Sequence, residues 1–322
     1  MFIRTVLLSG LSSILLNKKE VNLISHHYKI HIQRLLKLHQ ATPAPVVFFI
    51  AGCLPLPARL HLRIFSLFGQ ICRLGGGDNI LAKHAANIFS SASGSSKSWF
   101  WNVRQLCLQY DLPHPATWLV TKPAKQLVKI STKLVVHQYW LSKLRSEADL
   151  LPSLLYLNTR YLGLTKCHPI FRSCGSSPWE VEKAVTQARL LSGRYRLEAL
   201  SGHWIPWNKG GLCSLPGCWN TAASHKGTVE EFLLSCPSLG PTRLSLANYN
   251  RIFLCANPHL EDLMNKCLML DPIQFWIDCS TMGEVISTTQ SQDETILFGL
   301  LKLTRNYCHS LHKARCKLIA LN

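Results

Sequence analysis

The stretch that decides the fold class is PAKQLVKISTKLVVHQYWLSKLR, residues 123–145. Its apolar residues recur at the three- and four-residue steps of an α-helix. This apolar stripe comprises Leu127, Ile130, Leu134, Leu141 and Leu144. No long stretch of the chain alternates apolar and polar residues with the period of two that marks a half-buried strand. The sequence therefore predicts a mainly α-helical protein, an irregular assembly of many helices.

A second stripe of the same helix is cationic. Its four lysines follow one another at steps of three and four residues, and they are Lys122, Lys125, Lys129 and Lys133. Ammonium groups about one helical turn apart suit successive phosphates of a nucleic acid, whatever its base sequence. The alternative interpretation is a simple solvated helix face, and the sequence leaves both open.

The chain as a whole is basic although few of its residues are charged. Its 322 residues include 35 lysines and arginines against 17 acidic residues, a formal charge of +18, yet only 16% are charged. Residues 1–200 hold 25 of the basic and 8 of the acidic residues. Such an excess indicates an anionic partner, either a nucleic acid or an acidic membrane surface. The apolar share of 47% excludes an intrinsically disordered chain.

Further helices are expected on both sides of the first one, over residues 23–38, 59–74, 99–110, 177–191 and 295–318. The fourth has the clearest start, because Ser177 and Glu180 form a capping box with proline at the first helical position. Its apolar stripe is Val181, Ala184, Val185, Ala188 and Leu191. The last helix is expected to expose a polar stripe of Lys302, Arg305, His309 and Lys313.

We expect four regions along the chain. They are a basic helical region at 1–115, a second one at 116–200, a zinc-knuckle-like segment at 201–240 and a C-terminal helical region at 241–322. The apolar runs at 5–16 and 46–56 are too short to span a bilayer and are predicted to be core segments. No membrane partner is therefore expected.

The second basic region ends in Arg194-Tyr195-Arg196, and Arg189 precedes it in the helix. Guanidinium groups fork onto phosphate oxygens, and the Tyr195 ring offers a surface on which an unstacked base can stack. These residues and the four lysines are the predicted nucleic-acid site. In the alternative interpretation, Tyr195 packs into the core and the two arginines lie over it.

Thirteen cysteines are scattered along the chain, which favours a reducing compartment in which most serve as small buried apolar residues. Cys213 and Cys218 flank a Pro-Gly turn, and Cys236 follows eighteen residues later. Structural zinc sites use four nitrogen or sulfur ligands. Zinc is therefore the expected metal, with His225 or Glu231 as fourth ligand. The alternative is a loop that once bound metal and whose cysteines are now only packed.

An ordered series of short segments runs along nearly the whole chain. It includes AGCLP at 51–55, QYDLPHP at 109–115, ARLLSGRYR at 188–196, LCSLPGC at 212–218 and LTRNYC at 303–308. In this order the segments resemble the region downstream of the polymerase core in a non-LTR (LINE-type) retrotransposon reverse transcriptase. In that family's pattern a histidine stands five residues before the third cysteine, where this chain has Glu231.

The resemblance implies a segment that binds template RNA or target DNA and positions it for target-primed reverse transcription. It also implies an intracellular location, in the nucleus or cytoplasm. The polymerase motif of an aromatic residue followed by a paired Asp-Asp is not in this chain. We therefore expect no enzymatic activity and no small-molecule substrate. The rival interpretations are an inert or structural product of a truncated element and, more remotely, a Cys/His hydrolase.

Overall fold

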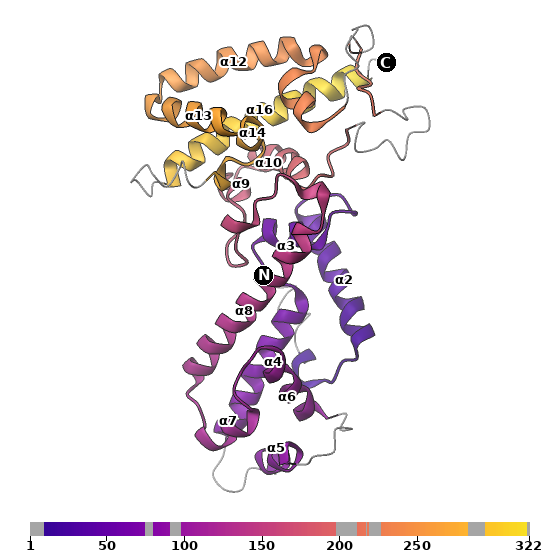
Figure 1. Ribbon diagram of the computed structural model, residues 1–322, viewed down its shortest axis with the longest axis vertical. Helices are drawn as coiled ribbons and strands as arrows, with labels where there is room; N and C mark the ends of the chain where they lie inside the picture. The colour runs from indigo at the N-terminus through magenta and orange to yellow at the C-terminus, as the bar shows by residue number, and fades with distance from the viewer. Residues whose placement is uncertain are drawn as a thin grey trace. The chain divides into compact units, whose positions relative to one another are not determined.

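The computed structural model describes residues 10–74, 80–90, 98–197, 211–216, 218, 227–282 and 294–320. Within these ranges the chain is mainly α-helical and contains no β-strand, which confirms the predicted fold class (Figure 1). The chain divides into two compact units. Unit 1 comprises residues 1–31 and 53–146, and unit 2 comprises residues 32–52 and 147–322. The finer division into four regions stays a prediction.

Unit 1 combines long helices with short ones. Its elements are η1 (Leu11–Ser13), the first part of α2 (Lys18–Leu35), α4 (Leu56–Arg73), α5 (Ile80–Ser90), α6 (Trp99–Gln109), α7 (Pro115–Thr121) and most of α8 (Lys125–Asp149). Helix α7 begins where the His114 imidazole accepts a hydrogen bond from the backbone of Ala116 and Pro115 occupies the first turn. Such starts position each helix without long loops.

The core of unit 1 is aromatic and centres on Phe68 of α4, which is fully buried. Its ring centroid lies 5.9 Å from that of Phe89 on α5 and 5.7 Å from that of Trp118 on α7. The ring of Phe100 on α6 is 6.5 Å away. Tilted and edge-to-face pairs of this kind stabilise a fold beyond the effect of apolar burial. Through them the Phe68 ring packs α4 against α5, α6 and α7.

The apolar stripe predicted for α8 is partly wrong. Leu127, Ile130 and Leu134 are 64%, 65% and 57% exposed. The buried residues recur at every fourth position instead, as Val128, Thr132, Val136, Trp140 and Leu144. Helix α8 is apolar on two faces, and the face that contains Val128 packs against α4. The two helices approach closely at Gly69 of α4, where an added Cβ would lie 3.1 Å from a side-chain carbon of Val128. Periodicity alone does not distinguish two such faces.

Unit 2 combines α-helices of very different lengths with several single helical turns. Its elements include α3 (Ala44–Ala51), η2 (Pro152–Leu154), η3 (Thr159–Tyr161), α9 (Pro169–Arg172), α10 (Pro178–Leu191), η4 (Glu231–Ser235), η5 (Pro237–Leu239), α12 (Gly240–Cys255), α13 (Pro258–Leu270), α14 (Pro272–Asp278), η6 (Cys279–Thr281) and α16 (Glu294–Ala320). Helix α16 packs along α10 and α14 (Figure 1). This packing forms the centre of unit 2.

The packing of α10 against α16 confirms one predicted stripe and corrects another. On α10, Ala184, Val185, Ala188 and Leu191 are buried and Val181 is half-buried, as predicted. On α16, the predicted polar stripe is partly wrong, because Arg305 and His309 are buried. Both face polar groups of unit 2, so these side chains find partners inside the unit and not in water.

The apolar run at 46–56 forms α3 and the start of α4, and its residues 46–50 are buried, as predicted for a core segment. Among the described helices, none is by itself long and apolar enough to cross a membrane. Helices α3 and α4 pass that test only when they are joined across the break between them.

Candidate arginine cavity and cysteine cluster

Three segments of unit 2 enclose a cavity of about 630 Å³, called here the arginine cavity. They are the turn after α2, the end of α10 with the residues that follow it, and the C-terminal half of α16. Its cationic lining is Arg189, Arg194, Arg196 and Arg315. The other lining residues are Leu38, His39, Gln40, Tyr195, His312, Cys316 and Ile319, so no carboxylate is among the described residues of the wall.

The end of α10 places three of these arginines together. Gly193 adopts a left-handed conformation with φ 62°, and its N–H bonds to the carbonyl of Leu190 at 3.0 Å. The next N–H, of Arg194, returns to the carbonyl of Arg189 at 3.2 Å. A Cβ at position 193 would meet the carbonyl oxygen of Ser153 at 2.1 Å, so only glycine fits this tight helix end.

Arg189 is held by the turn that follows α2. Its Nε and Nη2 atoms donate to the carbonyl of Lys37 at 3.2 and 3.0 Å. Lys37 is left-handed, and the buried Gln33 side chain donates to the carbonyls of Gln40 and Thr42, which holds the turn closed. The plane of the Arg189 guanidinium is therefore set by the backbone.

Tyr195 forms part of the cavity wall and is 5% exposed. Its ring lies 5.1 Å from that of Phe232, and its hydroxyl lies 2.8 Å from Nδ1 of His312. Burial raises the pKa of Tyr195, so its hydroxyl is protonated near pH 7. The burial of Tyr195 agrees with the alternative interpretation, in which its ring packs into the core. Arg194 and Arg196, the residues before and after Tyr195, are exposed.

His312 is a neutral imidazole near pH 7. Burial lowers its pKa, and the charges of Arg189 and Arg315 lower it further. Its Nδ1 shares a hydrogen bond with the Tyr195 hydroxyl. The cavity thus combines four guanidinium groups with two neutral polar side chains, an environment that favours an anion.

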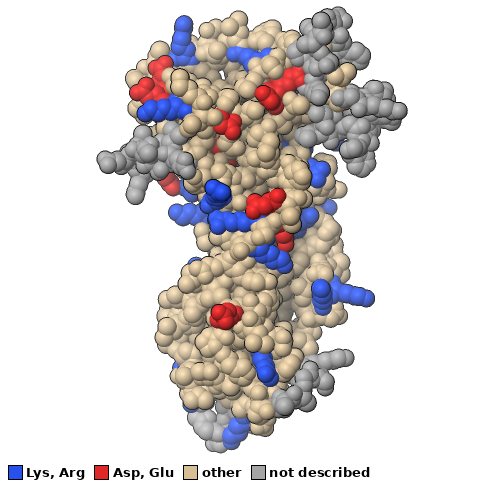
Figure 2. Space-filling model, viewed as in Figure 1, with Lys and Arg blue, Asp and Glu red and all other residues tan. Residues whose placement is uncertain are grey.

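The lysine stripe belongs to unit 1. All four lysines are exposed, with Lys122 ending α7 in a left-handed conformation and Lys125 beginning α8. The sequence of unit 1 contains 16 lysines and arginines against three acidic residues. On the visible face of unit 1, lysines and arginines are scattered singly among uncharged residues, and acidic side chains are sparse (Figure 2). The stripe is presented to solvent, as both interpretations of it require.

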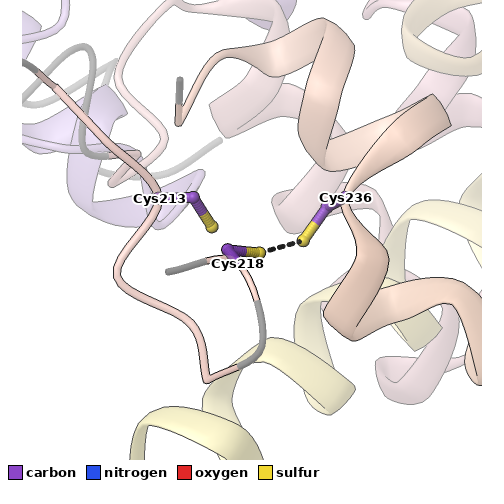
Figure 3. A group of neighbouring side chains, drawn as sticks. All are labelled: Cys213, Cys218 and Cys236. Carbon is purple, nitrogen blue, oxygen red and sulfur yellow. Dashed lines mark hydrogen bonds between the residues drawn. The ribbon is translucent and has the colours of Figure 1, made fainter. Parts of the chain in front are cut away.

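The three predicted cysteine ligands come together in unit 2 (Figure 3). The sulfur atoms of Cys213, Cys218 and Cys236 all lie within 4.8 Å of one another, and those of Cys218 and Cys236 are 3.5 Å apart. Cys218 and Cys236 are buried and Cys213 is 9% exposed. Three thiols at these separations are close enough to bind one metal ion, and thiolates are preferred ligands of zinc.

Two local turns position these sulfur atoms. The backbone N–H of Cys218 bonds to the carbonyl of Leu215 at 3.1 Å, which closes the turn after Cys213. On the other side, η4 is a single π-helical turn, and the N–H of Cys236 bonds to the carbonyl of Glu231 at 2.7 Å. Wide turns of this type frequently occur at functional sites.

The electrostatics of the cluster favour a negative charge on Cys236. A hydrogen bond from the Cys213 thiol lowers the pKa of Cys236 and outweighs the opposing effect of burial, and the Cys218 thiol lowers it further. Of the proposed fourth ligands, Glu231 is buried and lines a small cavity with Cys213 and Cys236, but it is not part of the sulfur cluster. His225 lies outside the described residues.

All 13 cysteines lie within the described residues, and none is in a disulfide. Outside the cluster six of the other ten cysteines are buried, in agreement with the prediction that most act as small apolar residues. Cys255 and Cys316 are exposed.

Sequence reasoning found three of the four cavity arginines and missed Arg315 and His312. Both lie on α16, three residues apart and therefore on one face of the helix. That spacing was the available signal, but nothing local connects it with Arg189, more than 100 residues earlier. The chain matches no protein-family model, no curated protein and no solved structure.

Proposed function

We propose that the chain is a non-catalytic, nucleic-acid-binding segment of the kind found downstream of the polymerase core in a non-LTR retrotransposon reverse transcriptase. The observation that carries this proposal is the convergence of four arginines on one cavity without a carboxylate among its described lining residues. Guanidinium forks match phosphate oxygens in shape and charge. The segment at 188–196, which is part of the resemblance, supplies three of the four arginines.

The lysine stripe supplies a second, sequence-independent contact in this proposal. Lys125, Lys129 and Lys133 are spaced along α8, while Lys122 ends α7 and does not lie on α8 as predicted. Exposed lysines of this kind neutralise phosphates as point charges and release the counterions condensed on the strand. The excess of 16 basic over three acidic residues in unit 1 supports the same role. The partner is RNA or DNA, and the chain's task is to hold and position it.

Zinc has a structural role in this proposal. Cys213, Cys218 and Cys236 would hold the ion, and the metal would supply a cross-link that stabilises the surrounding loops. The pKa of Cys236 supports metal binding, because a ligand thiol has to lose its proton.

Salt-dependent binding of a labelled single strand, followed by fluorescence anisotropy, tests the proposal. The logarithm of the affinity should fall linearly with the logarithm of the salt concentration. Changing three stripe lysines to glutamine should reduce the slope by about two to three, at roughly 0.7–0.9 per phosphate contact. The three are Lys125, Lys129 and Lys133. A matched control changes three exposed lysines of unit 2, namely Lys166, Lys266 and Lys302.

The control variant should retain the original slope. An unchanged slope in the stripe variant would identify the stripe as a simple solvated face. If the unaltered chain retains neither RNA nor DNA at low salt, the proposed function is wrong and the structural alternative replaces it.

A further inference from the structure

We propose that the arginine cavity binds the phosphorylated 5′ end of a single strand, and not the phosphodiesters along it. The inference rests on the proposed function and names the part of the nucleic acid that this cavity recognises.

The charge of the wall matches a chain end better than a backbone phosphate. Four guanidinium groups line one cavity, and no described lining residue is acidic. A phosphodiester brings one negative charge, whereas a phosphate monoester carries about −1.5 to −2 at pH 7. A terminal phosphate together with the first diester brings roughly −2.5 to −3, against about −2 for two successive diesters, and so compensates more of the charge of the wall.

The form of the cavity also favours a chain end. Its volume of about 630 Å³ is in the range of roughly 300–1,000 Å³ that is typical of pockets for small molecules. Proteins that follow a strand along its length use an extended basic groove with exposed aromatic rings. Here the only aromatic ring of a Trp, Tyr or Phe among the described lining residues is that of Tyr195, which is buried. The cavity is therefore suited to receive an end rather than to track a passing strand.

Two of the four arginines, Arg189 and Arg315, are held in place before any ligand arrives. The Lys37 carbonyl orients the Arg189 guanidinium, and the Tyr195 hydroxyl is hydrogen-bonded to the His312 imidazole. Arg315 is 8% exposed, and its guanidinium carbon lies 5.9 Å from the centre of the Tyr195 ring. Donors that are already ordered lose little freedom when the phosphate binds.

The test compares two labelled 12-nucleotide strands of one sequence, with and without a 5′-phosphate, at a single moderate salt concentration. The 5′-phosphorylated strand should bind about tenfold more tightly or better, a factor equivalent to roughly 1.4 kcal/mol. Changing Arg194 and Arg196 together to glutamine should abolish this preference. Both are exposed, so the fold should survive, and circular dichroism verifies it. The variant with three stripe lysines changed to glutamine should bind both strands more weakly by the same factor, so the preference for the 5′-phosphorylated strand should remain.

Competition distinguishes a strand end from a free anion. Inorganic phosphate and a nucleoside 5′-monophosphate should each displace the phosphorylated strand only at far higher concentration than an unlabelled phosphorylated strand. Displacement by inorganic phosphate at equal concentration would overturn the inference in favour of a free-phosphate site. Equal, salt-dependent binding of both strands would overturn it while leaving the proposed function intact. Retention of neither strand would refute the proposed function and this inference together.

Discussion

Arg305, near the middle of α16, donates two hydrogen bonds to Oε2 of Glu180 in the first turn of α10, from Nε at 3.3 Å and from Nη2 at 3.0 Å. Arg305 is 1% exposed. Its other donors reach Ser173 and the carbonyl of Ile170, and Lys183 donates to the second carboxylate oxygen at 2.6 Å. The pair therefore links α9, α10 and α16, and its buried guanidinium and half-buried carboxylate are compensated by several hydrogen bonds.

Removing one partner of this pair should destabilise unit 2 strongly. We expect Arg305→Ala to lower the free energy of unfolding by about 3–5 kcal/mol, because the carboxylate loses its buried partner. The joint change Arg305→Met, Glu180→Leu and Lys183→Met should cost less, since it removes all three paired charges together. Urea unfolding followed by circular dichroism measures both. Lys302→Ala, on the exposed side of α16, should stay within about 0.5 kcal/mol, and an equally small effect of Arg305→Ala would contradict the argument.

Glu180 should also make stability depend on pH. Burial raises the pKa of its carboxyl group, but hydrogen bonds from Lys183 and Arg305 outweigh burial and lower the pKa below the ordinary value. A lowered pKa stabilises the fold above the unfolded value of about 4.3, and that stabilisation is lost as pH falls through the folded pKa. Thermal unfolding measured from neutral to acid pH should show the melting temperatures of the unaltered chain and of Glu180→Gln converging as the pH falls. A constant difference down to the lowest pH would disprove this linkage.

The hydroxyl of Tyr110 should stabilise unit 1. It accepts a hydrogen bond from Nε1 of Trp140 at 2.9 Å and lies 2.6 Å from Nδ1 of His61. Burial lowers the pKa of His61 to about 4, so this imidazole is neutral near pH 7. Tyr110→Phe leaves the buried indole N–H without this acceptor and should cost about 1–3 kcal/mol. Tyr139→Phe, on a partly exposed neighbouring ring, is the matched control and should be nearly neutral in denaturant unfolding.

The cysteine cluster should take up one zinc or cobalt ion per chain. Metal binding requires loss of thiol protons, so it should weaken as pH falls. Cys236→Ser should abolish uptake, whereas Cys255→Ser, at an exposed cysteine of α12, should leave it unchanged. Glu231→His should tighten binding, because imidazole suits a thiolate-rich zinc site better than carboxylate. Elemental analysis and cobalt absorption measure the outcome, and equal uptake by Cys236→Ser would show that the cluster is only packed.

Local patterns in the sequence were sufficient to predict the helical class and the course of α10. The Ser177 side chain accepts from the backbone N–H of Glu180 at 3.4 Å, as one half of the predicted capping box requires. The buried stripe of α10 follows from the same three- and four-residue spacing. Cys213 and Cys218 meet across a turn that their own segment encodes. These features depend on residues only a few positions apart, and such residues interact in nearly any fold.

Tertiary structure decided what those local patterns left open. It chose the Val128 face of α8 over the Leu127 face, because α4 approaches at Gly69. It directed the Glu180 carboxylate to Arg305, and it brought Arg315 to the cavity that contains Arg189. The partners on α10 and α16 are more than 100 residues from each other in the sequence. The α8 case differs, because there two apolar faces of one helix compete for burial. The packing of α16 along α10 sets those long-range contacts, and no spacing within a single helix encodes which second helix will lie against it.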